Sequence, residues 1–296
     1  MTLTLAHLSD LHVGPLPRPH WRELMGKRLT GYWNWHKHRH DIHDMDALDA
    51  IIRDIVASTP DHVALVGDLV NIGLAAEYPL AAKKVAQLGD AHHVSIVPGN
   101  HDVYVRHSLA AMQDILGDYM RGDDGAPGFP YLRVRKGVAL IGLSSAIPTL
   151  PLLADGRIGH AQLGRFARLL EHARKTCRAT VVMIHHPPHR GGARLFRGLR
   201  DALALEQVLE RYGADLVLHG HNHKRSVRML TAASGSSIPV VGVASASAVP
   251  GDPLHRAAWH RYRIDTSGNR PTISLEVRGI EGPDDVVRTI DQVTLI

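Results

Sequence analysis

Residues 94–102 read Val-Ser-Ile-Val-Pro-Gly-Asn-His-Asp, an apolar run that ends in a glycine and three polar side chains. A short run rich in valine and isoleucine, ended by Pro-Gly, is typical of a buried strand ending near Val97. Asn100, His101 and Asp102 follow where the chain leaves that strand. Ligand-binding side chains of α/β sheets collect at such carboxyl ends. The stretch therefore predicts both a sheet and the edge of it that carries chemistry.

The same pattern, an apolar strand followed directly by polar side chains, recurs at four other places in the chain. Each place alone has an ordinary explanation, because Asp and Asn after a strand commonly cap a helix or form a turn. Five such strand ends together indicate a site built from several strands. The other four carry Asp10 and His12 after a strand at 3–8, Asp68 after 62–66, His185 and His186 after 180–184, and His221 and His223 after 215–218.

Strand and helix patterns alternate along most of the chain, which indicates an α/β fold. After residue 223 the pattern becomes β-rich, and we expect this late part to supply a second sheet. No linker interrupts the sequence, so one domain spanning 1–296 is the simplest organisation. Helices are expected at 46–56, 75–88, 109–120, 161–175 and 202–212, and further strands at 131–134, 138–143, 226–230, 239–243, 259–264 and 272–277.

The order, spacing and residue types of the five strand ends resemble the signature of the calcineurin-like metallophosphoesterases: Asp-x-His, Gly-Asp, Gly-Asn-His-Asp, His and Gly-His-x-His. The resemblance covers residues 3–245 and is nearest to the bacterial class III cyclic-nucleotide phosphodiesterases. It implies a metallophosphoesterase sandwich of two packed mixed β-sheets flanked by helices. It also implies a two-metal site at the strand ends and hydrolysis of a phosphate ester.

Carried over by position, the resemblance implies seven metal ligands, with Asp68 bridging two ions. Carboxylate, imidazole and amide ligands without thiolate suit Mn²⁺, Fe or Zn²⁺. The resemblance makes His101 the general acid that protonates the leaving group. Asp102 would orient His101 by accepting its other ring N–H, or would cap the following helix. The remaining ligands are Asp10, His12 and His223 for one metal, and Asn100, His185 and His221 for the other.

Substrate recognition must come from segments around the metals, and the stretch after the fourth strand end is one candidate. His186 would support the site as a neighbour of ligand His185. Arg190 and Arg194 lie among glycines, where they could clamp a phosphate group or belong to a solvated basic loop. We count His186, Arg190 and Arg194 as candidate substrate-binding residues.

Residues 15–45 form a second candidate, because they are longer than a usual strand-to-helix connection. Apolar side chains from Trp21 to Trp33 recur at helical spacing among basic residues, which predicts a basic amphipathic helix. Gly26 and Gly31 weaken that helix by about 1 kcal/mol each. Three roles stay open for this insertion or cap segment: a cap over the active site, a surface helix on anionic lipid, or a dimer contact.

Composition limits the partners. The formal charge is +5, and residues 18–40 hold six Arg or Lys against one Glu. Charge confined to one segment argues against a nucleic-acid-binding face, but allows peripheral membrane contact through 18–40. Cys177, the single cysteine, lies in a predicted helix and favours a reducing compartment such as the cytoplasm. No secretion signal or membrane-spanning run is expected, which leaves the cytoplasm or the inner face of the membrane.

These observations lead us to expect a phosphodiesterase that uses a metal-bridging hydroxide on a small phosphate ester such as a cyclic nucleotide. The alternative is a hydrolase like UDP-2,3-diacylglucosamine diphosphatase, acting at the membrane surface, and it depends on residues 15–45. A non-catalytic scaffold with the same fold is the third hypothesis. The oligomeric state and the identity of the two metals do not follow from the sequence.

Overall fold

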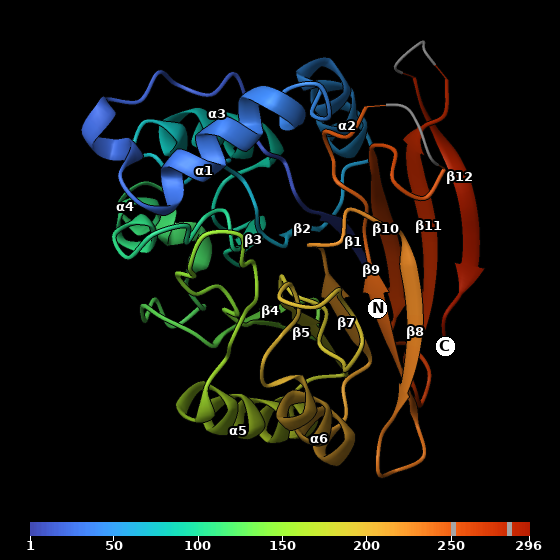
Figure 1. Ribbon diagram of the computed structural model, residues 1–296. Helices are drawn as coiled ribbons and strands as arrows, with labels where there is room; N and C mark the ends of the chain where they lie inside the picture. Colours follow the sequence, from blue (N-terminus) through green and yellow to red (C-terminus); the bar gives the residue numbers. More distant parts are fainter. Residues whose placement is uncertain (250–252, 283–285) are drawn as a thin grey trace.

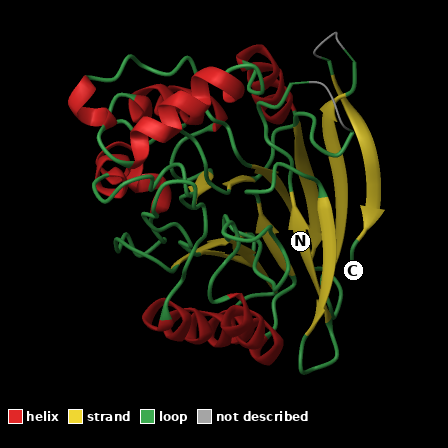
Figure 2. Cartoon of the chain, in the orientation of Figure 1, coloured by secondary structure: helices red, strands yellow, loops and turns green. Residues whose placement is uncertain are grey.

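The computed structural model describes residues 1–249, 253–282 and 286–296, without the side chains of residues 38 and 39. Strands and helices of the described part alternate as the sequence predicts (Figures 1 and 2). The strands are β1 (Thr2–Leu8), β2 (His62–Leu65), β3 (Val94–Ile96), β4 (Tyr131–Arg135), β5 (Val138–Gly142), β6 (Ala179–Met183), β7 (Leu216–His219), β8 (Ser226–Thr231), β9 (Ser237–Gly242), β10 (Ala258–Asp265), β11 (Thr272–Ile280) and β12 (Val287–Thr294).

The α-helices match the predicted helical ranges to within a few residues. Cys177 is the first residue after α5 rather than part of it. No helix among the described residues is both long and apolar enough to cross a bilayer. The helices are η1 (Trp21–Leu24), α1 (Lys27–Asn34), η2 (Trp35–Arg39), α2 (Met45–Ala57), α3 (Glu77–Leu88), α4 (Ser108–Leu116), η3 (Gly117–Met120), α5 (His160–Thr176) and α6 (Ala202–Tyr212).

The described strands form two sheets of six, in the orders β12-β11-β10-β1-β2-β3 and β4-β5-β6-β7-β9-β8. The sheets face each other across a shared apolar core that includes Leu5 of β1, Leu140 of β5 and Met183 of β6. A further apolar cluster joins α5 and α6 to the outer face of the second sheet. The fold is therefore the mixed α/β sandwich that the sequence predicts.

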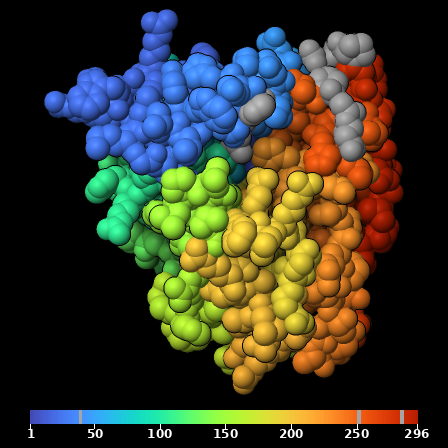
Figure 3. Space-filling view, in the orientation of Figure 1, coloured from blue at the N-terminus to red at the C-terminus, as the bar shows by residue number. Residues whose placement is uncertain are grey.

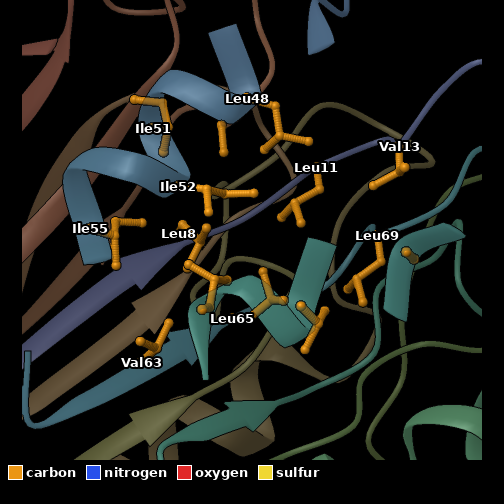
Figure 4. Close-up of a cluster of buried hydrophobic side chains, with 14 of the residues drawn as sticks. Leu8, Leu11, Val13, Leu48, Ile51, Ile52, Ile55, Val63, Leu65 and Leu69 are labelled. Carbon is orange, nitrogen blue, oxygen red and sulfur yellow. The ribbon is translucent and has the colours of Figure 1, made fainter. Parts of the chain in front are cut away.

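Helix α2 shows how the apolar spacing of the sequence places one layer. Leu48, Ile51 and Ile55 are fully buried against the first sheet (Figure 4). Full burial of one such side chain stabilises the fold by about 1.5–3 kcal/mol. The helix begins where the carboxylate of Asp44 accepts hydrogen bonds from the backbone N–H groups of the first turn.

The late β-rich part divides between the two sheets, so the expectation that it supplies the second sheet is wrong for β10, β11 and β12. β10, β11 and β12 extend the first sheet, because β10 pairs antiparallel with β1. Of the strands after residue 223, only β8 and β9 belong to the second sheet. The sequence does not indicate β12, because most of its residues are exposed and its apolar side chains do not alternate with a buried face.

The predicted amphipathic helix from Trp21 to Trp33 is interrupted. Gly26 has a φ of 75°, a conformation that glycine adopts without a steric penalty, and it separates η1 from α1. The expectation that Gly26 weakens a single helix is therefore wrong, because this glycine separates two helices. The side chains of residues 38 and 39 within the proposed 18–40 contact lie outside the described part.

Candidate metal centre

The candidate ligands follow five parallel strands whose carboxyl ends meet where the two sheets adjoin. β1, β2 and β3 are parallel neighbours in the first sheet, and β6 and β7 are parallel neighbours in the second. The loops after these strands turn sharply. Five candidate ligands adopt positive φ: Asp10 (56°), His12 (42°), Asp68 (55°), His221 (69°) and His223 (50°).

Such a backbone costs on the order of 1–3 kcal/mol per non-glycine residue and persists where the surrounding structure enforces it. Its concentration at one cluster of polar side chains marks a functional site. Glycines before the ligands allow the close approach. At Gly67, with a φ of 92°, a β-carbon would lie 2.7 Å from Nδ1 of His185. At Gly220 it would lie 2.6 Å from Oδ2 of Asp10.

One group of potential ligands contains Asp10, His12, Asp68 and His223. Nε2 of His223 lies 3.2 Å from Oδ1 of Asp10 and 3.3 Å from Nε2 of His12. Asp10 and His12 are buried, whereas the side chain of His223 is 23% exposed. This group therefore faces the more open side of the site.

The second group contains Asp68, His185 and His221, with Asn100 beside them. Oδ1 of Asn100 lies 2.8 Å from Nδ1 of His221 and 3.2 Å from Nε2 of His185. The two imidazole nitrogens are 3.3 Å apart. All four side chains are buried.

Asp68 belongs to both groups. Its Oδ2 lies 3.3 Å from Nε2 of His185 and 4.0 Å from Nε2 of His12. Its Oδ1 accepts a hydrogen bond from the backbone N–H of His101 at 2.7 Å. One carboxylate therefore stands between two clusters of imidazoles, which is the arrangement that a shared ligand requires.

The donor atoms fit metal ions. Two nitrogens bound tetrahedrally at 2.0–2.1 Å lie roughly 3.3 Å apart, close to the separations described above. Buried Oδ1 of Asp10 lies 3.2 Å from Nε2 of His223 but has no partner with hydrogen-bond geometry within the described structure, so a cation would satisfy it. The outer ring N–H groups point away from the centre. Nδ1 of His12 donates to the Val70 carbonyl, and Nδ1 of His185 donates to the Val66 carbonyl.

His221 follows the same rule with its nitrogens exchanged. Its Nε2 donates to the Arg197 carbonyl at 2.6 Å, so the lone pair of Nδ1 faces Asn100. A backbone carbonyl that accepts the outer N–H fixes the tautomer of a metal-binding histidine. These imidazoles are therefore held with a lone pair toward the centre.

The electrostatics favour positive charge at the centre. Burial lowers the pKa of His12 and His221, which keeps both rings neutral and able to coordinate. Burial also opposes protonation of His185, but the adjacent Asp68 carboxylate outweighs it and raises the pKa of His185 to about 9. A proton there occupies the same attractive position that a divalent cation would.

His101 is held beside the second group. Its Nδ1 donates to the carbonyl of Asn71, and its ring stacks on Tyr104 at 5.5 Å. His101 also lines a pocket, and Nε2 is the ring nitrogen that could exchange a proton with a molecule bound there. This position suits a residue that transfers a proton to a bound substrate.

Asp102 does not orient His101, so the predicted pairing is wrong; the acceptor is Asn71. The Asp102 carboxylate accepts N–H groups at 2.8 Å from Asp68, Leu69 and Gly99, and at 3.2 Å from Val70. Nor does it cap α4, whose N-cap is residue 107. Asp102 instead joins the turn after β2 to the turn after β3.

The three predicted substrate-binding side chains lie in three different environments. His186 is buried beside His185, with its two ring nitrogens bonded to Ser145 and to the Ala154 carbonyl, and it lines neither pocket at the centre. Arg190 forms an ion pair with Glu206 at 3.0 Å and does not line either pocket at the centre. Arg194 does line one of them, together with His221 and His223.

Two pockets open at the candidate centre. One, of about 380 Å³, lies beside Asn100 and His101 and is lined by Lys27, Trp33 and other side chains. The other, of about 630 Å³, lies beside His221 and His223. Both are lined by Arg197. Arg197 lies in the same basic loop as Arg190 and Arg194 but was not among the predicted substrate-binding residues. For Lys27, the sequence offers no indication of a role beyond its place in the basic segment.

Helix α1 covers the side of the centre that holds His101. The Arg28 guanidinium donates to the carbonyls of Ile72 and Gly73, in the loop after β2. Nζ of Lys27 donates to Thr149 at 2.5 Å and lies 4.3 Å from the Tyr104 ring centroid. Of the three roles left open for residues 15–45, this packing is what a cap would show.

Residues 3–225 match the family model for the calcineurin-like phosphoesterases. No curated protein matches the sequence. A solved dimetal phosphatase from Danio rerio superposes with a TM-score of 0.59 and 14% identity, over 99% of this chain and 98% of that one.

Two other solved structures share the fold. A purple acid phosphatase from yellow lupin (Lupinus luteus) has a TM-score of 0.61 and 13% identity, over 99% of this chain and 53% of its own. A 5'-nucleotidase precursor from Thermus thermophilus has a TM-score of 0.53 and 16% identity, over 94% and 54%. The chain thus spans about half the length of these two proteins. With the family model covering most of its length, the chain belongs to the calcineurin-like phosphoesterases, a family of metal-dependent phosphoester hydrolases.

Proposed function

We propose that the protein hydrolyses a phosphodiester of a small, nucleotide-like substrate at a two-metal centre. The observation that carries the proposal is the position of Asp68, whose Oδ2 lies between His185 at 3.3 Å and His12 at 4.0 Å. In the proposed assignment Asp10, His12 and His223 hold one ion, Asn100, His185 and His221 hold the other, and Asp68 contacts both.

Two bound divalent ions would supply an activated water and offset the negative charge of the phosphate during in-line displacement. The chain's own part is to hold the substrate and move a proton. Nδ1 of His101 is bonded to Asn71, so we assign protonation of the leaving oxygen to Nε2. Lys27 and Arg197 line the same pocket and would hold an anionic ester.

The pocket beside His101 favours a nucleotide over a bare phosphate. Trp33, Trp35 and Tyr104 line it, and its volume of about 380 Å³ lies within the usual range of small-molecule sites. Stacking of a base on an aromatic side chain is worth about 1–3 kcal/mol. This pocket supports the cyclic nucleotide as the preferred diester.

Both ligand groups draw on loops from both sheets, because Asp10 and His223 lie together, as do Asn100 and His221. Neither sheet alone carries a complete group. We therefore infer that residues 1–296 act as one phosphoesterase domain with 15–45 as its cap.

The test is steady-state hydrolysis by the Mn²⁺-loaded protein of four substrates: bis-p-nitrophenyl phosphate, p-nitrophenyl phosphate, cyclic AMP and UDP-2,3-diacylglucosamine. Asp68→Ala is the inactive control, and Asp114→Asn, an exposed change on α4, is the neutral one. Turnover of the diester or cyclic AMP that is lost only in Asp68→Ala supports the proposal. A folded, metal-loaded protein that hydrolyses none of the four points to a scaffold.

A second candidate, a lipid-linked phosphate ester reached from a membrane surface, is favoured by the apolar side chains around the site. Leu152, which lines the pocket of His101, is 91% exposed, and Leu195, beside Arg194, is 80% exposed. Further exposed apolar side chains belong to the N-terminal segment, which is coloured blue and occupies the upper left of the face in Figure 3. They are Trp21, Met25, Leu29 and Trp33.

Basic side chains accompany these apolar groups. The Arg22 guanidinium lies 5.2 Å from the ring centroid of Trp21, and Nζ of Lys37 lies 4.4 Å from that of Trp33. Aromatic and basic groups side by side are typical of helices that bind anionic lipid. Preference for UDP-2,3-diacylglucosamine, enhanced by anionic vesicles and reduced in Trp21→Ser, would favour this candidate over the nucleotide.

A further inference from the structure

We propose that His43, which belongs to the segment before α2, is an eighth ligand of the metal centre and joins the ion held by Asp10, His12 and His223. The proposal rests on the proposed two-metal function and deepens it. It makes residues 15–45 part of the metal centre as well as its cover.

The first support is geometric. The ligand nitrogens of His12, His43 and His223 lie within 4.8 Å of one another, and this group shares His12 and His223 with the group that contains Asp10 and Asp68. The ring centroid of His43 is 4.4 Å from that of His12 and 5.7 Å from that of His223. The ring of His43 therefore lies close to both His12 and His223, the two imidazoles assigned to one ion.

The second support is that the backbone holds His43 in place. His43 forms an isolated antiparallel bridge with Ala248. On either side, the N–H of Asp44 donates to the Ser247 carbonyl at 2.7 Å, and the N–H of Val249 donates to the Ile42 carbonyl at 3.0 Å. A side chain anchored by these bonds needs little reorganisation to coordinate a metal.

The third support is the orientation of the ring. Nδ1 of His43 lies 2.8 Å from Oγ of Ser247, and that hydroxyl is also 3.4 Å from the carbonyl of Asp10. If Nδ1 donates to the hydroxyl, the hydroxyl donates to Asp10, and Nε2 of His43 keeps a lone pair. This repeats the rule seen at His12 and His185, whose outer nitrogens are also bonded to the protein.

Coordination chemistry allows the additional imidazole. The group of Asp10, His12, Asp68 and His223 offers four protein atoms. Manganese and iron prefer more than four ligands, so a fifth protein ligand would replace a water molecule. Because His43 lies near the end of the cap segment, loss of the metal would also loosen residues 15–41, where basic residues offer trypsin sites such as Arg22.

The experiment compares full-length wild type, His43→Ala, His40→Ala and His223→Ala after chelation and dialysis. His40 is in the same segment, with a side chain 45% exposed, so its variant is the matched control. Mn²⁺ binding is followed by equilibrium dialysis with elemental analysis. We expect two ions per chain in wild type and His40→Ala, and at least tenfold weaker binding of one ion in His43→Ala, as in His223→Ala.

His43→Asp serves as a rescue, because a carboxylate can coordinate Mn²⁺ while a merely packed imidazole could not be replaced by it. Affinity restored in His43→Asp, together with Mn²⁺ protection of Arg22 from trypsin that is lost in His43→Ala, supports the proposal. An isotherm of His43→Ala that coincides with that of His40→Ala overturns it, even if turnover falls, because His43 would then contact substrate. A wild type that binds fewer than two ions overturns the two-metal function itself.

Discussion

Replacement of His101 by glutamine tests the proton-transfer step. Glutamine keeps a hydrogen-bond donor near the position of the ring but cannot give up a proton at neutral pH. Nδ1 of His101 donates to the Asn71 carbonyl, so the proposal assigns the proton transfer to Nε2. The Asp102 carboxylate does not share this task, because it is committed to backbone N–H groups.

General acid catalysis contributes typically 10²–10⁴-fold, which corresponds to about 2.7–5.5 kcal/mol in the activation free energy. We therefore expect kcat/KM for a diester with an alkoxide leaving group, such as cyclic AMP, to fall at least 100-fold in His101→Gln. Bis-p-nitrophenyl phosphate releases a stable anion that needs no proton, so its kcat/KM should fall less than about tenfold.

The assay is the ratio of the two kcat/KM values at pH 7.5 with both metals bound, checked by elemental analysis. Because the ratio cancels losses of folded or loaded enzyme, it reports leaving-group protonation alone. Equal losses on both substrates would refute the assignment of His101 as the acid.

Three further predictions concern neighbouring groups. Asp102→Asn should lower Mn²⁺ affinity at least tenfold and reduce turnover of both ester types equally, because it disturbs the ligand turns; a leaving-group effect like that of His101→Gln would contradict this. Burial lowers the pKa of Lys27 to about 8, although the charges of Asp68 and Asp155 raise it in part. Above that pH the anion-binding charge is lost, so kcat/KM for the diester should decline from pH 7 to 9.5, and Lys27→Met should be low and flat in the same profile. Burial lowers the pKa of His62 to about 2 and that of His260 to about 3. The unfolded chain then binds protons below pH 6.5 that the folded chain does not, and stability falls with decreasing pH by about 1–1.5 kcal/mol per histidine between pH 7.5 and 5.5. Urea unfolding of the metal-free protein should show this loss reduced in His62→Gln, and an unchanged loss would contradict it.

The fold and the residues that gather at the centre could be predicted because both follow from local patterns. An apolar run followed by Gly-Asp or Gly-Asn-His-Asp identifies a strand and the side chains at its end. Parallel strands then bring those ends together, as Asp68 and His185 show. Burial of α2 follows in the same way from its helical spacing.

The predictions that were wrong concern contacts between segments that are distant in the sequence. Nothing in the sequence indicates that Asn71, rather than Asp102, accepts the N–H of His101. Arg190 resembles Arg194 in the sequence, yet only Arg190 has Glu206 beside it. The position of β10 beside β1 likewise depends on the return of the chain across the first sheet.

His43 was missed for a related reason. It does not follow a strand, and the segment that contains it is notable in the sequence for its aromatic and basic residues rather than for metal ligands. Only the bridge to Ala248 brings it to His12. A histidine immediately before a well-capped helix was the one available signal, and it is a weak one.

Electron paramagnetic resonance of the Mn²⁺-loaded protein tests the central claim most directly, because ions about 3.5–4 Å apart that share a carboxylate couple their spins. We predict two Mn²⁺ per chain with an exchange-coupled spectrum in wild type and in Asp114→Asn, and an uncoupled spectrum with weakened binding in Asp68→Ala. One Mn²⁺ per chain, or two ions without coupling in the wild type, would contradict the account.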